Sequence, residues 1–103
     1  MKAMNVHHNN FHQEVILSEK PVLLDFWAPW CGPCRMISPV LEEIAASRPD
    51  IKVAKVNVDQ EMELASQFRV ASIPMLVVLE KGNILRQSVG VRPRNQILDL
   101  IDG

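Results

Sequence analysis

The chain has 103 residues, of which 48% are hydrophobic and 22% charged, and its formal net charge is −1. This length fits one domain with one hydrophobic core, so we expect residues 1–103 to form a single domain. The balanced charge, without a basic stripe, argues against a nucleic-acid partner, and no apolar run approaches the ~18 residues that a membrane span requires.

The first part of the chain predicts a helix followed by a buried strand. Asn10 and Gln13 have the spacing of a capping box, which predicts a helix over about residues 10–18. The next segment, residues 22–28, follows a proline and is almost continuously apolar. Runs of this kind form strands that are buried on both faces of a sheet.

The only two cysteines, Cys31 and Cys34, follow this strand and are separated by Gly32 and Pro33. Pro33 suits a helix start because its φ is already helical and it has no N–H to leave unpaired. With Cys34 in the first turn, the two cysteines are neighbours on one helix face, and their Cα atoms are roughly 5–6 Å apart. Such a pair can close and open with little strain, so the spacing predicts a redox-active disulfide.

Three other interpretations of the cysteine pair remain open. A structural bridge would stabilise little, because it closes a very short loop. A zinc site normally needs four ligands, and the chain adds only His7, His8 and His12, which lie in a polar stretch and are expected to be solvated. The third interpretation is a pair of inert thiols.

The rest of the chain alternates between helices and strands. From Pro33 to Ile44 an apolar residue recurs every three or four positions, which predicts a helix with a kink at Pro39. Strands alternating with helices, then a hairpin and a final helix, predict an α/β sandwich around a mixed sheet. The remaining expected elements are a strand over 51–58, a helix over 61–68, hairpin strands over 75–79 and 84–89, and a helix that opens at Pro93.

Five separated segments resemble the thioredoxin family, in register and along essentially the whole chain. The resemblance implies a five-stranded mixed sheet flanked by four helices, with the cysteines at the C-terminal end of strand 22–28. It also implies a protein-disulfide reductase without a cofactor of its own, because a thioredoxin reductase would recharge it and NADPH would act only through that reductase. The matching segments are residues 25–34 (DFWAPWCGPC), Pro39, residues 53–59 (VAKVNVD), residues 72–74 (SIP) and residues 89–90 (VG).

Some positions depart from the family's common pattern. Met75 stands where many members have Thr, Leu79 where Phe is usual, and Val91 where Ala is commoner. None of these changes removes a catalytic group. We expect Met75 and Val91 to influence which substrates dock.

The position of each cysteine relative to the helix start predicts its role. Cys31, just before the helix, faces unpaired backbone N–H groups and the positive end of the helix dipole, which favour a thiolate. Cys34 lies further into the helix and is more shielded. We therefore expect Cys31 to attack a substrate disulfide and Cys34 to resolve the mixed disulfide that results.

Resolution requires a base for the Cys34 thiol, and Asp25 is the candidate. Its neighbours on the same strand face, Leu23 and Trp27, are apolar, so burial is expected to raise the pKa of Asp25 toward neutrality. The family arrangement implies that Lys55 lies on the adjacent strand as the partner of Asp25. A solvated Lys55 without such a role is the alternative.

The resemblance also implies that Ile73-Pro74 forms a cis-proline loop beside the cysteines. A cis bond would turn the backbone of Ser72 and Ile73 toward an extended substrate chain, which would pair with it as an added strand. Exposed apolar clusters usually mark a docking face. The docking patch expected around Cys31 consists of Trp30, Gly32, Pro33, Ile73, Pro74, Gly90 and Val91.

Two rival functions use the same fold. An oxidase or isomerase would keep both cysteines, but the Gly-Pro dipeptide between them is typical of the reductases. A binding module with an incidental disulfide is opposed as the main role by a full catalytic set, and it stays open as a second role. This set consists of Cys31, Cys34, Asp25 and Pro74. Two cysteines are few for a secreted disulfide scaffold, and the N-terminal stretch lacks a signal peptide's apolar core, so we expect a cytoplasmic monomer that reduces disulfide-containing proteins.

Overall fold

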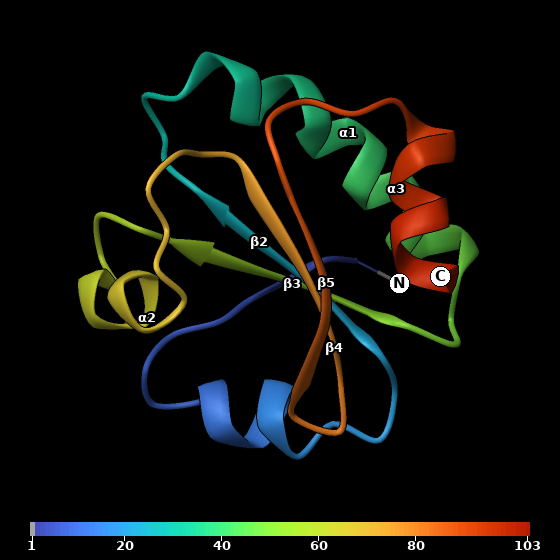
Figure 1. The fold of residues 1–103 in the computed structure, drawn as a ribbon, viewed down its shortest axis with the longest axis horizontal. Coiled ribbons are helices and arrows are strands. Elements are labelled where there is room, and N and C mark those ends of the chain that lie inside the picture. Colours follow the sequence, from blue (N-terminus) through green and yellow to red (C-terminus); the bar gives the residue numbers. More distant parts are fainter. Residues whose placement is uncertain (1) are drawn as a thin grey trace.

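The computed structural model describes residues 2–103, which form one five-stranded sheet between two layers of helices (Figure 1). The strand order is β1-β3-β2-β4-β5. The pairs β1–β3 and β3–β2 are parallel, whereas β2–β4 and β4–β5 are antiparallel. The elements are β1 (Met4–Asn5), η1 (His12–Ile16), β2 (Val22–Trp27), α1 (Gly32–Ser47), β3 (Lys52–Asn57), α2 (Met62–Gln67), β4 (Met75–Glu80), β5 (Asn83–Val89) and α3 (Arg94–Asp102). The expected mixed sheet of five strands with four helical segments is confirmed.

Each face of the sheet has its own hydrophobic core, because side chains alternate along every strand. On one face Leu23 packs with Ile37 of α1 and Ile97 of α3. On the other face Leu24 packs with Val15 of η1 and Leu64 of α2. The central strand β2 is therefore buried on both sides, as its apolar run predicts.

The first helix differs from its sequence prediction. It covers only His12–Ile16 and is a π-helix, with the N–H of Leu17 donating to the carbonyl of His12. No side chain caps its N-terminus. The predicted capping box is wrong because Asn10 is used in the preceding turn, where its Oδ1 accepts from the backbone N–H of His7 at 2.6 Å.

The other predicted elements are present with bounds shifted by at most three residues. α1 runs through Pro39 as one continuous helix. The β4–β5 hairpin turns at Lys81 and Gly82, which both have positive φ, at 51° and 80°. This pair of values matches the mirror-image turn that fits the twist of antiparallel strands.

The two ends of the sheet differ in what lies beside them. Figure 1 shows the start of α1, the α2–β4 connection and the β5–α3 connection at one end, and η1 with the β4–β5 turn at the other. Within residues 2–103, no helix has the length and apolar character needed to cross a membrane.

Candidate active site

The two cysteines form a disulfide at the N-terminus of α1, with their Cα atoms 5.3 Å apart. Cys31 is the N-cap residue and has extended backbone angles, φ −87° and ψ 108°. Its Sγ accepts a hydrogen bond from the backbone N–H of Cys34 at 3.2 Å. The helix start therefore directs a backbone donor at the first sulfur, in the position where a helix best stabilises negative charge.

Both cysteines are largely covered, with relative exposures of 4% for Cys31 and 3% for Cys34. They pack with Ala28, and Trp27, Val58 and Ile73 lie against this small cluster. The two residues between the cysteines, Gly32 and Pro33, are exposed. The exposed Gly-Pro pair therefore borders a disulfide that is itself almost fully covered.

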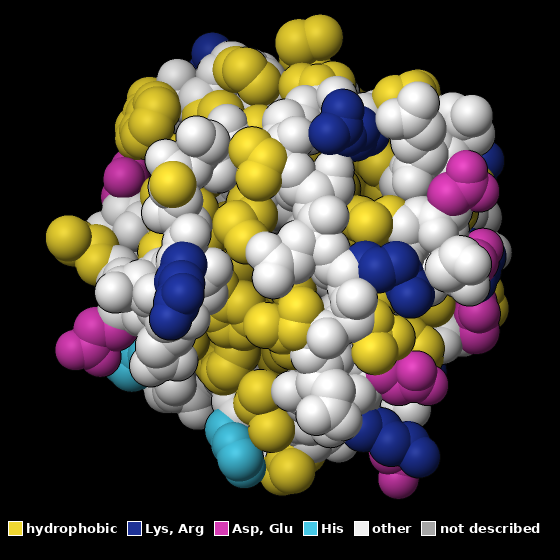
Figure 2. Space-filling model, viewed as in Figure 1, with side chains coloured by type: hydrophobic (Ala, Val, Ile, Leu, Met, Phe, Trp, Pro, Cys, Tyr) yellow, Lys and Arg dark blue, Asp and Glu magenta, His cyan; other side chains and the backbone are white. Residues whose placement is uncertain are grey.

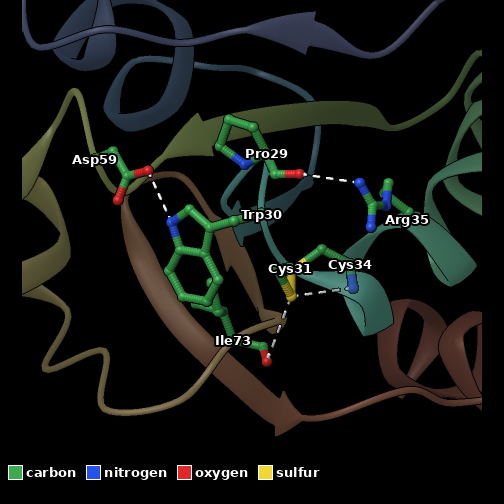
Figure 3. The surroundings of a disulfide bond; sticks show 7 residues. All are labelled: Pro29, Trp30, Cys31, Cys34, Arg35, Asp59 and Ile73. Atoms are coloured by element: carbon green, nitrogen blue, oxygen red, sulfur yellow. Dashed lines mark hydrogen bonds between the residues drawn. A yellow bond between two sulfur atoms is a disulfide. The ribbon is translucent and has the colours of Figure 1, made fainter.

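Trp30 is the most exposed aromatic residue next to the disulfide, with 67% of its surface accessible. Its indole Nε1 donates to Asp59 Oδ2 at 2.9 Å, and Figure 3 shows the ring directed toward this carboxylate. Asp59 in turn follows β3, and its N–H donates to Asn57 Oδ1. The Trp30–Asp59 hydrogen bond therefore fixes the orientation of the Trp30 ring, whose apolar surface remains open to solvent.

The Ile73-Pro74 bond is cis, and its loop lies beside the disulfide. The carbonyl oxygen of Ile73 is 3.9 Å from Cys31 Sγ. Figure 3 shows this carbonyl directed toward the disulfide. On the other side of the loop, the N–H of Gly90 donates to the Pro74 carbonyl at 2.8 Å. The next residue, Val91, is 40% exposed. Gly90 and Val91, two residues expected in the docking patch, are thus tied to this loop through the Gly90–Pro74 backbone bond.

Asp25 lies on β2 and is buried, with 1% relative exposure. Burial raises the pKa of Asp25 from 3.8 to about 7, and the positive charge of Lys55 opposes this shift. The expected burial is therefore confirmed. Its Oδ1 has no hydrogen-bond partner among the described residues, so no donor at this oxygen stabilises the ionised form.

Lys55 lies on β3 directly beside Asp25 in the parallel β2–β3 register, as expected. Its ammonium group does not pair with Asp25 within 4.0 Å in the part of the chain that the structure covers. Instead Nζ donates to Ser38 Oγ at 3.1 Å and lies 5.0 Å from the centre of the Trp27 ring. Lys55 is therefore a partly buried residue with defined partners rather than a solvated one.

The sequence is similar to known proteins along nearly its whole length. It matches the model of the thioredoxin family over residues 2–103. It is 50% identical over 86 residues to thioredoxin of Alicyclobacillus acidocaldarius, covering 82% of each chain. It is 47% identical over 93 residues to thioredoxin 1 of Synechococcus elongatus, covering 89% of this chain and 87% of the relative. It is also 40% identical over 102 residues to thioredoxin of Haemophilus influenzae, covering 98% and 95%.

The chain belongs to the thioredoxin family. As a thioredoxin it is a thiol–disulfide oxidoreductase that reduces disulfides by dithiol–disulfide exchange at Cys31 and Cys34. Family members carry their redox chemistry in the cysteine pair itself. Residues 2–103 contain no cluster of three or more His, Cys, Asp or Glu side chains arranged to hold a metal ion.

Sequence reasoning missed two contacts of this thioredoxin site, those of Ser38 and Asp59. Ser38 was detectable, because it lies four residues after Cys34 and so faces the same side of α1. No local sequence pattern predicted the contact of Asp59 with Trp30, because the two residues are 29 positions apart. His7 and His8 are exposed, as expected, with accessible fractions of 49% and 76%, and their rings lie beside Glu61, with His8 Nδ1 2.9 Å from Oε1 and His7 Nδ1 3.6 Å from Oε2.

Proposed function

We propose that Cys31 is the attacking nucleophile of this thioredoxin and Cys34 the resolving thiol. The observation that carries this assignment is the Cys34 N–H directed at Cys31 Sγ at the helix N-terminus. In the reduced protein this donor and the helix dipole favour a thiolate on Cys31. Attack by this thiolate on a substrate disulfide forms a Cys31–substrate bond and releases the other substrate sulfur as a thiolate, which takes up a proton.

The second step requires a deprotonated Cys34. Asp25 is the proposed base, because its carboxyl group is buried and its pKa of about 7 matches a proton acceptor that works near neutral pH. The Cys34 thiolate attacks Cys31 Sγ, which breaks the mixed disulfide, forms the Cys31–Cys34 bond and releases the second substrate thiolate. Two electrons pass from the dithiol to the substrate.

Protein substrates are proposed to dock on the apolar surface around Cys31. Two observations support this docking proposal. Trp30 and Val91 are exposed, and the Ile73 carbonyl lies beside the nucleophilic sulfur of Cys31. An extended substrate segment can pair with the backbone of the Ile73-Pro74 loop while its disulfide lies over Cys31. The docking patch proposed here consists of Trp30, Gly32, Pro33, Ile73, Pro74, Gly90 and Val91.

The partners that complete this cycle are disulfide-containing proteins and a thioredoxin reductase. The reductase returns two electrons to the Cys31–Cys34 disulfide, so NADPH acts only through it and the chain needs no bound cofactor. Because a reductant must itself be kept reduced, we propose that the protein acts in the cytoplasm. We also propose that residues 1–103 form a single domain that acts as a monomer.

Trapping experiments test the assignment of the two cysteines. In Cys34→Ser, the mixed disulfide cannot be resolved, so substrate proteins should accumulate on Cys31 as adducts visible on non-reducing gels. Cys31→Ser should neither trap substrate nor reduce insulin. If Cys31→Ser instead gives the stronger adducts, the roles are reversed.

A further inference from the structure

The distance between the Asp25 carboxyl group and the Lys55 ammonium group depends on side-chain contacts, because the backbone places the two residues side by side. The two residues are direct neighbours in the parallel β2–β3 register and point to the same face of the sheet. Neighbouring side chains of opposite charge on one sheet face normally attract each other. Yet the ammonium group of Lys55 bonds to another residue, and Asp25 Oδ1 is left without a partner among the described residues.

Two side chains hold the ammonium group of Lys55 away from the carboxyl group. Ser38 on α1 accepts a hydrogen bond from Nζ at 3.1 Å. The Trp27 ring lies 5.0 Å from Nζ, a distance at which a cation is attracted to the ring face. Ser38 lies one helical turn after Cys34, so the residue that holds Lys55 is fixed to the same helix as the cysteine that must lose a proton.

We propose that Ser38 is a positioning residue of the reaction, which holds the Lys55 ammonium group away from Asp25 and so keeps the carboxyl group able to accept the proton of Cys34. This inference rests on the proposed role of Asp25 as base. A carboxylate in contact with an ammonium group is a weaker base, because the charge pair stabilises its ionised form. Ser38 therefore acts on the chemistry through Lys55 and touches neither sulfur nor substrate in the proposed cycle.

Apart from Lys55, few charged groups near Asp25 would change position when Ser38 is replaced. Its neighbour on the β4 side is the apolar Leu76. On the β3 side Lys55 is the charge that acts on the Asp25 pKa. On α1 the charged side chains Arg35, Glu42 and Glu43 are exposed, and Cys34 is held in the disulfide of the oxidised protein. His7 lines a surface pocket together with Trp27 and Lys55. A shift in Asp25 titration on changing Ser38 thus reports the position of the Lys55 ammonium group.

The first test is Ser38→Ala, with Asp25 titration followed directly through its carboxyl carbon by NMR in the oxidised protein. Loss of the Ser38 hydroxyl frees the ammonium group to approach the unpartnered Oδ1. The pKa of Asp25 should then fall by on the order of one pH unit. The pH profile of insulin reduction should move in the same direction, toward acid.

Three controls separate positioning from a general effect on the fold. Ser38→Thr keeps a hydroxyl group and should titrate like the parent. Ser47→Ala makes the same change near the other end of α1, where the hydroxyl bonds the Ile44 carbonyl, and should leave Asp25 unchanged. In a Lys55→Met background, Ser38→Ala should cause no further shift, because the charge that Ser38 positions is gone.

The outcomes distinguish this inference from the function on which it rests. An unchanged or raised Asp25 pKa in Ser38→Ala, or an equal shift in the Lys55→Met background, would overturn the role of Ser38. If the Asp25 pKa falls but the pH profile of reduction does not move, Ser38 does position Lys55, and the assignment of Asp25 as base fails instead.

Discussion

Asp25 is a carboxyl group enclosed between an apolar strand neighbour and a lysine that is bound elsewhere. Such a group is costly to ionise, because burial removes it from water and no donor in the described chain compensates its Oδ1. The same cost makes it useful, since a carboxyl group that is half protonated near neutral pH can both accept and return a proton. Stability and chemistry are therefore linked at this one residue.

The first prediction concerns the pH dependence of stability. The pKa of Asp25 is about 7 in the folded protein and 3.8 in the absence of burial. The folded state therefore binds more protons between these values, and its free energy of unfolding should fall as the pH rises from 4 to 7, by about 4 kcal/mol for this group. Asp25→Asn does not titrate and should lose this slope, so it should be more stable than the parent at pH 8.

Urea unfolding of the oxidised proteins at pH 4, 6 and 8 measures this effect. Asp99→Asn, at an exposed position of α3, is the matched control and should keep the slope of the parent. Equal slopes for the parent and Asp25→Asn would mean that Asp25 titrates normally in the folded protein.

At the scale of elements, the sequence was informative wherever a pattern is local. The buried run of β2, the amphipathic α1 and the turn between β4 and β5 depend on periodicity and on turn residues, and all three are present. The N-terminal segment was not predictable in this way. β1 has only two residues, too few for an alternating pattern, and it forms because its backbone pairs with β3 about 50 positions away.

The same distinction applies to the site. The spacing of Cys31 and Cys34 and the apolar neighbours of Asp25 are local, so the disulfide and the buried carboxyl group could be predicted. The spacing of Ser38 from Cys34 places it on the same side of α1, but its contact with Lys55 depends on how α1 packs on β3, which no local pattern specifies. The cis bond before Pro74 and the Lys55 position next to Asp25 were expected only through the family resemblance.

The second prediction concerns how α3 is attached to the sheet. Arg86 of β5 donates through Nε to the Leu100 carbonyl at 2.6 Å and through Nη2 to the Ile101 carbonyl at 3.1 Å. These carbonyls lie in the last turn of α3, where a cation also compensates the helix dipole. Arg86→Ala should therefore cost about 1.5–3 kcal/mol of unfolding free energy and increase amide exchange in α3.

Arg94→Ala provides the comparison for Arg86→Ala. Arg94 is itself in α3, but its contact with Glu43 is 3.8 Å long and both side chains are exposed, so the loss should be below about 1 kcal/mol. Urea unfolding and hydrogen exchange measure both variants. Similar costs for the two would mean that the Arg86 contacts do not anchor the helix.

At the scale of the whole molecule, exposed apolar side chains occur at both ends of the sheet. Trp30 and Val91 lie on the segments next to the disulfide, whereas Leu17 follows η1 at the opposite end. Figure 2 shows a band of hydrophobic side chains through the middle of one face, between α2 and β5, with Lys and Arg side chains on either side. Apolar exposure alone therefore does not distinguish the proposed docking patch from other exposed apolar positions, and what sets this patch apart is its position beside Cys31.

The last prediction uses this difference in position. Val91→Asp places a charge in the docking patch and should lower the rate of insulin reduction about tenfold, because a protein substrate would have to desolvate that charge. Reduction of a small disulfide reagent should change by less than about twofold, since the reagent reaches Cys31 without covering the patch. Leu17→Asp introduces the same charge at another exposed apolar position, remote from the disulfide, and should leave both rates unchanged. The ratio of the two activities is the measurement: a ratio that stays constant in Val91→Asp, or that falls equally in Leu17→Asp, would show that protein substrates do not bind on this patch.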